Sequence, residues 1–147
     1  MKKVLVALIP VLLAPALCSS PGAVAASSTM TLTAHLAGSN EVGAAGAPGG
    51  TGTASIRISM ATGRLCYTLR VSGFTLPALA AHIHAGRAGK IGPIVVPFPT
   101  APGKTGRATG CKMVSASLLK GITGHPTSYY VNVHTAKYPG GAVRGQL

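Results

Sequence analysis

Acidic residues are almost missing from this chain of 147 residues. Glu41 is its one carboxylic side chain, whereas lysine and arginine together number 13 and give a formal net charge of +12. A pair of catalytic carboxylates cannot be built from one acid, and a Ser-His-Asp triad is excluded in its usual form. We expect a structural role for Glu41, in which it accepts hydrogen bonds from the backbone or from Arg144 and pins the first long loop.

Tryptophan is also missing, aromatic residues make up 4% of the chain, and the basic residues are scattered without forming a run. Single-stranded nucleic acids are held by basic grooves in which aromatic side chains stack on the bases. The composition therefore disfavours a nucleic-acid partner. A basic surface still attracts anions, so an anionic cell-envelope polymer or another exported protein is the partner that we expect.

Long apolar segments are limited to the N-terminal end. Two lysines precede an apolar run over residues 4–17, and small residues follow it. This order is typical of a secretory signal peptide, and two prolines make the run too short and broken for a membrane span. We expect residues 1–26 to be the signal peptide, with cleavage after Ala25 or Ala26. The mature protein would then be secreted or held in the cell envelope, with no transmembrane segment.

The remaining part, residues 27–147, is about 120 residues long and has the size of one domain with a real core. It holds two cysteines, Cys66 and Cys111. In an exported chain an even pair most simply indicates a disulfide, because an oxidising compartment disfavours the alternative of a thiolate metal site.

Short segments with period-two alternation of apolar and polar residues dominate this part, and glycine- and proline-rich loops separate them. Such segments indicate strands, and their spacing indicates an all-β antiparallel sandwich or Greek-key barrel. A single helical turn is expected at 117–122. The expected strands are 30–38, 53–60, 64–73, 78–86, 93–98, 108–115, 128–136 and 141–147.

Histidines stand out in two of these strands. In "AHIHA" the alternation places His82 and His84 opposite Ile83, and in "YYVNVHT" it places His134 on the face away from the valines. Same-face residues two apart lie roughly 6.5–7 Å from each other along a strand, which two imidazoles can bridge over one ion. Nitrogen ligands suit copper or zinc and not calcium or magnesium. A fourth ligand would have to come from His35 or His125.

The segments "LAGSNEV", "AHIHAGRAGKIGPIVV" and "YYVNVHTAKYPGGAVRGQL" resemble the CHRD domain, over a range from about residue 31 to the C-terminus. The resemblance implies an immunoglobulin-like β-sandwich with limited similarity to copper/zinc superoxide dismutases, and it implies no settled biochemical activity. The loop after Glu41 and the histidine at 125 depart from the family pattern. The matching residues are His82, His84, Gly86, Gly92, Pro93, Tyr130, Asn132, His134, Thr135, Pro139, Gly141, Arg144 and Gly145.

From these observations we expect an exported, non-enzymatic CHRD-domain binding module, whose histidines either hold copper or zinc or are half-exposed strand residues hydrogen-bonded to backbone or water. Arg87 and Lys90 in the glycine-rich loop, together with Arg144, are candidates for anion or loop contacts. One alternative is a copper-dependent redox protein with a superoxide-dismutase-like fold. The zinc site of those enzymes uses an aspartate that this chain lacks, and we predict no dismutase activity. A further alternative is a charge-driven binder of anionic polymers.

Overall fold

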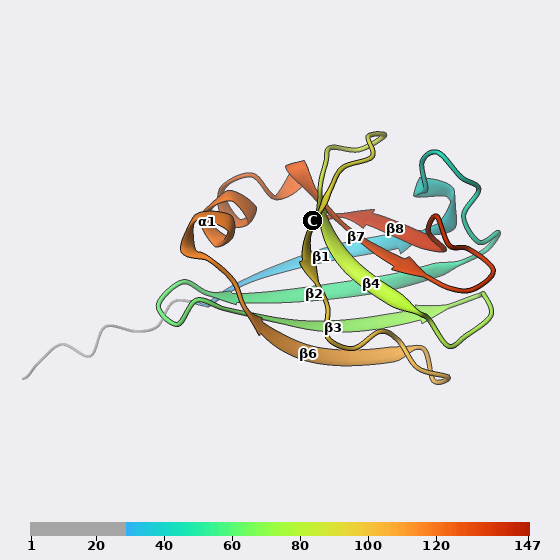
Figure 1. The fold of residues 1–147 in the computed structure, drawn as a ribbon, viewed down its shortest axis with the longest axis horizontal. Helices are drawn as coiled ribbons and strands as arrows, with labels where there is room; N and C mark the ends of the chain where they lie inside the picture. Colours follow the sequence, from blue (N-terminus) through green and yellow to red (C-terminus); the bar gives the residue numbers. More distant parts are fainter. Residues whose placement is uncertain (1–28) are drawn as a thin grey trace, which may run out of the picture.

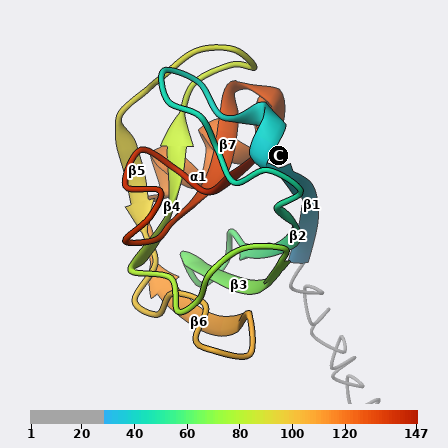
Figure 2. The same ribbon diagram turned by 90° about the vertical axis from the view of Figure 1, so that its right-hand side faces the viewer.

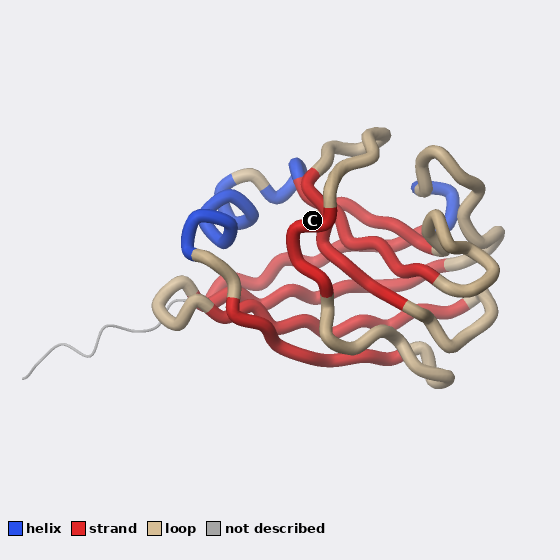
Figure 3. The backbone as a smooth tube through the Cα atoms, in the orientation of Figure 1, coloured by secondary structure: helices blue, strands red, loops and turns tan. Residues whose placement is uncertain are grey.

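A computed structural model describes residues 29–147, and it consists of antiparallel strands with one short helix (Figures 1 and 3). The predicted signal peptide, residues 1–26, lies outside the described residues. The strands are β1 (Thr29–Ala37), β2 (Thr51–Ser59), β3 (Arg64–Ser72), β4 (Ala80–Ala85), β5 (Ile94–Pro97), β6 (Arg107–Met113), β7 (Tyr129–His134) and β8 (Val143–Gln146). All eight lie within the segments expected from the alternation, except that β1 and β6 begin one residue earlier and β2 begins two residues earlier.

The helical part is longer than the sequence pattern indicates. Helix α1 covers Ala116–Gly124, where a single turn was expected. The Ser115 hydroxyl accepts a hydrogen bond from the backbone N–H of Leu118, which caps the first turn, and Leu119 and Ile122 on one side of the helix are buried. Two short 3₁₀ turns, η1 (Gly38–Asn40) and η2 (Pro126–Ser128), complete the elements.

The strands form one continuous sheet in the order β5-β4-β7-β8-β1-β2-β3-β6. Figure 2 shows how this sheet curls so that its two halves face each other. At the junction of the halves, β8 pairs with β1 through a single register position, Ala37 with Arg144. At the opposite edges the Lys112 ammonium donates to the carbonyl oxygen of Pro97 at 3.4 Å. The result is a half-barrel, and the prediction of an all-β sandwich or barrel is confirmed.

Most apolar side chains of the strands point into the space between the two halves, whereas Ile94 and Met113 are exposed. Ile56, Leu69, Ile83 and Val131 are fully buried there, and the Tyr67 ring stacks on that of Phe98 with 4.0 Å between centroids. Burial of this kind stabilises a fold by roughly 25 cal/mol per Å² of apolar surface removed from water. The alternation that fills the core also sends every second residue to the outer face of each half.

Cys66 and Cys111 form a disulfide, as predicted. They occupy directly opposed positions on β3 and β6, so the bond ties edge strand β6 to its neighbour on the outer face. Over residues 29–147, none of the helices has the length and apolar character needed to cross a membrane.

Candidate metal centre

Strand pairing brings the three predicted histidines onto one face. β4 and β7 run antiparallel with His82 opposite Asn132 and Ala80 opposite His134, while His84 lies opposite Tyr130. Directly opposed residues in an antiparallel pair project to the same side of the sheet. Because Ile83 and Val131 fill the core, these residues point to the outer face of the half formed by β5, β4, β7 and β8.

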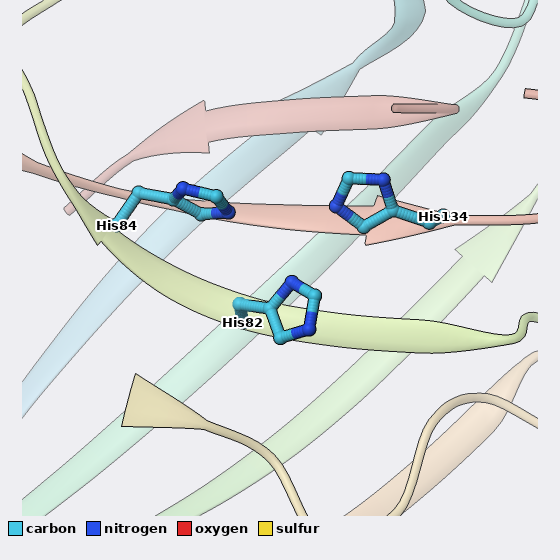
Figure 4. Close-up of side chains that lie close together, drawn as sticks. All are labelled: His82, His84 and His134. Atoms are coloured by element: carbon cyan, nitrogen blue, oxygen red, sulfur yellow. The ribbon is translucent and has the colours of Figure 1, made fainter. Parts of the chain in front are cut away.

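The three imidazole rings lie side by side on that face (Figure 4). Ring centroids are 5.6 Å apart for His82 and His84, 5.2 Å for His82 and His134, and 6.4 Å for His84 and His134. One ring nitrogen from each histidine points toward the space between the rings, and these atoms lie within 4.8 Å of one another. Nitrogens that share one zinc ion at about 2.0–2.1 Å are roughly 3.3–4 Å apart, so small side-chain rotations would close the site.

Backbone carbonyls fix the orientation of two of the rings. The Nδ1 of His84 contacts the carbonyl oxygen of Gly92 at 2.9 Å, and the Nδ1 of His134 contacts that of Pro139 at 2.9 Å. A carbonyl oxygen can only accept a hydrogen bond, so each Nδ1 carries the proton and each Nε2 has a free lone pair. Metal-binding histidines in proteins are oriented by this kind of second hydrogen bond.

The inward-facing nitrogens have no other partner. His82 Nδ1, His84 Nε2 and His134 Nε2 are buried and form no hydrogen bond within residues 29–147. Leaving a buried polar atom without a partner is unfavourable by about 1–3 kcal/mol, so three such atoms around one point are a costly arrangement unless a ligand accepts their lone pairs.

Burial favours the neutral form of two of these imidazoles, His82 and His84. Burial lowers the pKa of His82 to about 4, with a further decrease from the neighbouring His134 and His84. Burial likewise lowers the pKa of His84, although its hydrogen bond to the Gly92 carbonyl acts in the opposite direction. Neutral imidazole is the form that binds a metal.

A stack of side chains supports His84 from behind. The Tyr130 ring lies almost parallel to the His84 ring, with 4.7 Å between centroids, and the Arg144 guanidinium lies 3.4 Å from the centre of the Tyr130 ring. The backbone N–H of Gly92 donates to the Tyr130 hydroxyl at 3.3 Å. The peptide groups around Gly92 therefore hold both His84 and Tyr130.

Arg144 also organises the glycine-rich loop after β4. Its Nη2 donates to the carbonyl oxygens of Arg87 at 3.1 Å and Lys90 at 2.7 Å. Arg144 is only 3% exposed, whereas Arg87 and Lys90 are exposed. Of the three residues predicted to make anion or loop contacts, Arg144 thus binds the loop backbone, and the other two present their side chains to solvent.

Glu41 and Asn132 meet beside this stack. Asn132 Nδ2 donates to both carboxylate oxygens of Glu41, at 2.7 and 2.9 Å. Burial raises the pKa of Glu41 to about 7, against the opposing effects of the Arg144 charge and the Asn132 hydrogen bond. The sequence suggested Arg144 as the partner of Glu41, but the guanidinium uses its hydrogen bonds on the loop carbonyls, and the amide of Asn132 takes its place.

The two candidates for a fourth ligand lie elsewhere. His35 is exposed on β1, opposite Thr53, and His125 follows α1; neither joins the histidine group. Sequence reasoning also missed the carbonyl groups of Gly92 and Pro139, because a backbone group leaves no side-chain signature. The glycine at 92 offered a partial signal, since a Cβ there would overlap the carbonyl oxygen of Ala85.

Comparison with known families gives one result. A family model described as the CHRD domain matches residues 32–147, which is most of the chain. The comparison with curated proteins returns no match. The comparison with solved structures returns none either.

Proposed function

Because the chain belongs to the CHRD domain family, we propose that it is an exported binding module that holds a copper or zinc ion between His82, His84 and His134. The family supports a binding role, and the charged, apolar and small-residue regions of segment 1–26 support export. The disulfide between Cys66 and Cys111 fits an oxidising compartment outside the cytoplasm.

One observation carries the metal proposal. Three buried imidazole nitrogens without hydrogen-bond partners face one space, and in two of the rings a backbone carbonyl leaves the inward nitrogen unprotonated. An all-nitrogen donor set of this kind fits copper and zinc. The ion would supply a positive charge and an open coordination position, while the chain's own residues orient the rings.

Binding is favoured over turnover because the chain has so few groups that could move protons. Its one carboxylic side chain, Glu41, is engaged by Asn132, and His82, whose pKa is lowered to about 4 by burial, is itself a proposed ligand. A copper-dependent redox protein is the second candidate. Two observations support it. Three nitrogen ligands would leave one coordination position free, and His82 and His134 are only partly buried, so a reactant could approach that position from solvent.

Metal analysis of the purified mature protein after equilibrium dialysis tests the first proposal. We expect one zinc or copper ion per chain in the wild type and a loss of binding in His82→Ala. His35→Ala is the matched control, because His35 lies on the exposed face of the other half of the sheet and should leave the stoichiometry unchanged. Equal binding by the wild type and His82→Ala would disprove the site.

Electron paramagnetic resonance separates the two candidates when copper is the ion. Nitrogen hyperfine splitting that disappears in His82→Ala is expected in both cases. Reduction of the bound Cu(II) by ascorbate and its reoxidation by dioxygen over repeated cycles would favour the redox protein. A copper ion that binds and does not cycle supports the binding module.

A further inference from the structure

Among residues 29–147, no element covers the outer face of the half-sheet formed by β1, β2, β3 and β6, which carries none of the three candidate metal ligands. The core residues of β1, β2, β3 and β6 point inward, and Figure 2 shows the other elements on that inner side. The opposite face carries hydroxyl side chains together with four of the chain's arginines. We call this surface the arginine face. Its residues are Thr31, Thr33 and His35 on β1, Thr51, Thr53, Ser55, Arg57 and Ser59 on β2, Arg64, Cys66, Thr68, Arg70 and Ser72 on β3, and Arg107, Thr109 and Cys111 on β6.

Two of these arginines occupy directly opposed positions on neighbouring strands. Arg70 on β3 and Arg107 on β6 are register partners, and both are exposed. Like charges at directly opposed positions destabilise a sheet, because their Cβ atoms are only about 4.5–5.5 Å apart. The chain's one acidic side chain, Glu41, is engaged by Asn132 outside the arginine face. The pair therefore lacks a carboxylate partner, and an anion placed between the two guanidiniums would relieve the repulsion.

The surface around Arg70 and Arg107 has room for an anion. Arg70 and Arg107 line an open depression with a volume of about 470 Å³, whose wall includes the hydroxyl-bearing residues Thr51, Thr53 and Ser72. The Thr51 and Ser72 hydroxyls contact each other across the strands at 3.4 Å. Guanidinium forks match carboxylate or sulfate groups, and hydroxyls both donate to and accept from other hydroxyls.

The remaining arginines lie at the other end of the face. Arg57 is opposite Cys66, and Arg64 is two residues before that cysteine on β3, which makes the two arginines diagonal neighbours. Arg64 and Arg70 are six residues apart on one strand, a separation of roughly 20 Å. A small anion can occupy only one of these ends, whereas an extended polymer lying along β3 reaches both. Strand propensity accounts for the threonines, but it does not account for the opposed arginines.

We infer that the arginine face binds an acidic polysaccharide, with Arg70 and Arg107 holding its acid groups and the rows of serine and threonine hydroxyls facing its sugar hydroxyls. A polyphosphate offers only acceptor oxygens and would leave the acceptor lone pairs of the hydroxyls unmatched, whereas sugar hydroxyls both donate and accept. Single-stranded nucleic acid would find no aromatic stacking surface on this face. The inference rests on the proposed role as a binding module and is independent of the metal ion.

Alginate, a carboxylated polysaccharide, is a suitable probe in surface plasmon resonance, with neutral dextran as the uncharged control. We expect the wild type to bind alginate with an affinity that falls as the salt concentration rises, and to show no binding to dextran. The double variant Arg70→Gln/Arg107→Gln should bind about tenfold more weakly, because two exposed ion pairs are lost. Arg70→Lys/Arg107→Lys keeps the positive charge, so it should recover part of the affinity. The recovery should be incomplete because lysine lacks the planar guanidinium fork.

The matched control is Lys120→Gln/Lys137→Gln, which removes two exposed charges from α1 and from the loop after β7. Its affinity should stay close to that of the wild type. An equal loss in both double variants would show that net charge alone drives binding and would overturn the assignment. Tighter binding of polyphosphate or single-stranded DNA than of alginate, at matched charge, would overturn the polysaccharide as partner.

Two further measurements keep this result separate from the metal proposal. His82→Ala should bind alginate like the wild type, and Arg70→Gln/Arg107→Gln should bind one metal ion per chain. An unchanged circular dichroism spectrum shows that the arginine variant is folded. Loss of alginate binding in His82→Ala would place the polymer at the histidines and contradict the arginine face.

Discussion

Asn132 and Glu41 are 91 residues apart in the sequence and meet through two hydrogen bonds from one amide nitrogen to both carboxylate oxygens. The contact ties the loop after β1 to the centre of β7, next to the stack that supports His84. It also leaves Asn132 Oδ1 buried without a hydrogen-bond partner in the described residues. A carboxylate in this position is held away from water, and its pKa is raised to about 7.

The raised pKa of Glu41 predicts a dependence of stability on pH. A carboxyl group whose folded pKa lies above its unfolded value of 4.5 favours the folded state below that value, and this contribution is lost as pH rises toward about 7. Glu41→Gln removes the titration, and the new amide can donate to Asn132 Oδ1. We therefore expect the free energy of unfolding of Glu41→Gln, relative to the wild type, to rise by about 1–2 kcal/mol between pH 5 and pH 8, after allowance for partial solvent exposure.

Urea denaturation at the two pH values measures this difference directly. The titrations of the histidines are common to both proteins and cancel in the comparison. A difference in stability that is constant with pH would mean that Glu41 keeps an ordinary pKa.

Gly92 offers a test of how the loop positions the metal ligands. A Cβ at this residue would overlap the carbonyl oxygen of Ala85, so Gly92→Ala must displace the peptide that contacts both His84 and Tyr130. Disturbing a group that orients a metal-binding histidine typically weakens metal affinity by about 10–100-fold. We expect a loss in this range in zinc competition titrations. Gly124→Ala is the control, because a Cβ there enters open space; similar losses in both variants would contradict the positioning role.

The sequence contained most of the fold and the identity of the three histidines. Period-two alternation locates the strands and assigns His82, His84 and His134 to outward-facing positions, because it depends only on local geometry. Strand order is set by long-range pairing, so the sequence could not show that β4 and β7 are neighbours. The contact of Glu41 with Asn132 was missed for the same reason, since charge alone favoured Arg144. The arginine face was equally hidden, because Arg70 and Arg107 meet only once β3 and β6 pair.

The disulfide should contribute strongly to stability. It joins residues separated by 45 positions, and in the chain-entropy model a loop of that length stabilises the fold by about 4 kcal/mol. We expect the double variant Cys66→Ser/Cys111→Ser to lose roughly 2–4 kcal/mol in urea denaturation. The wild type under reducing conditions should match the variant. A loss below about 0.5 kcal/mol would show that pairing of β3 with β6 does not depend on the bond.

Metal binding should persist in mildly acidic solution. An isolated imidazole with a pKa near 6.5 is mostly protonated at pH 5 and competes poorly for a metal. Burial lowers the pKa of His82 to about 4, so this ring stays neutral at pH 5, and burial also lowers the pKa of His84. We expect protonation of His82 to weaken zinc affinity by less than about threefold between pH 7 and pH 5, and the steep loss caused by this ring to begin only below about pH 4. Isothermal titration calorimetry across this range measures the affinity, and an NMR titration of the His82 ring in the metal-free protein measures its pKa; a midpoint near pH 6.5 would show that His82 titrates as an exposed side chain.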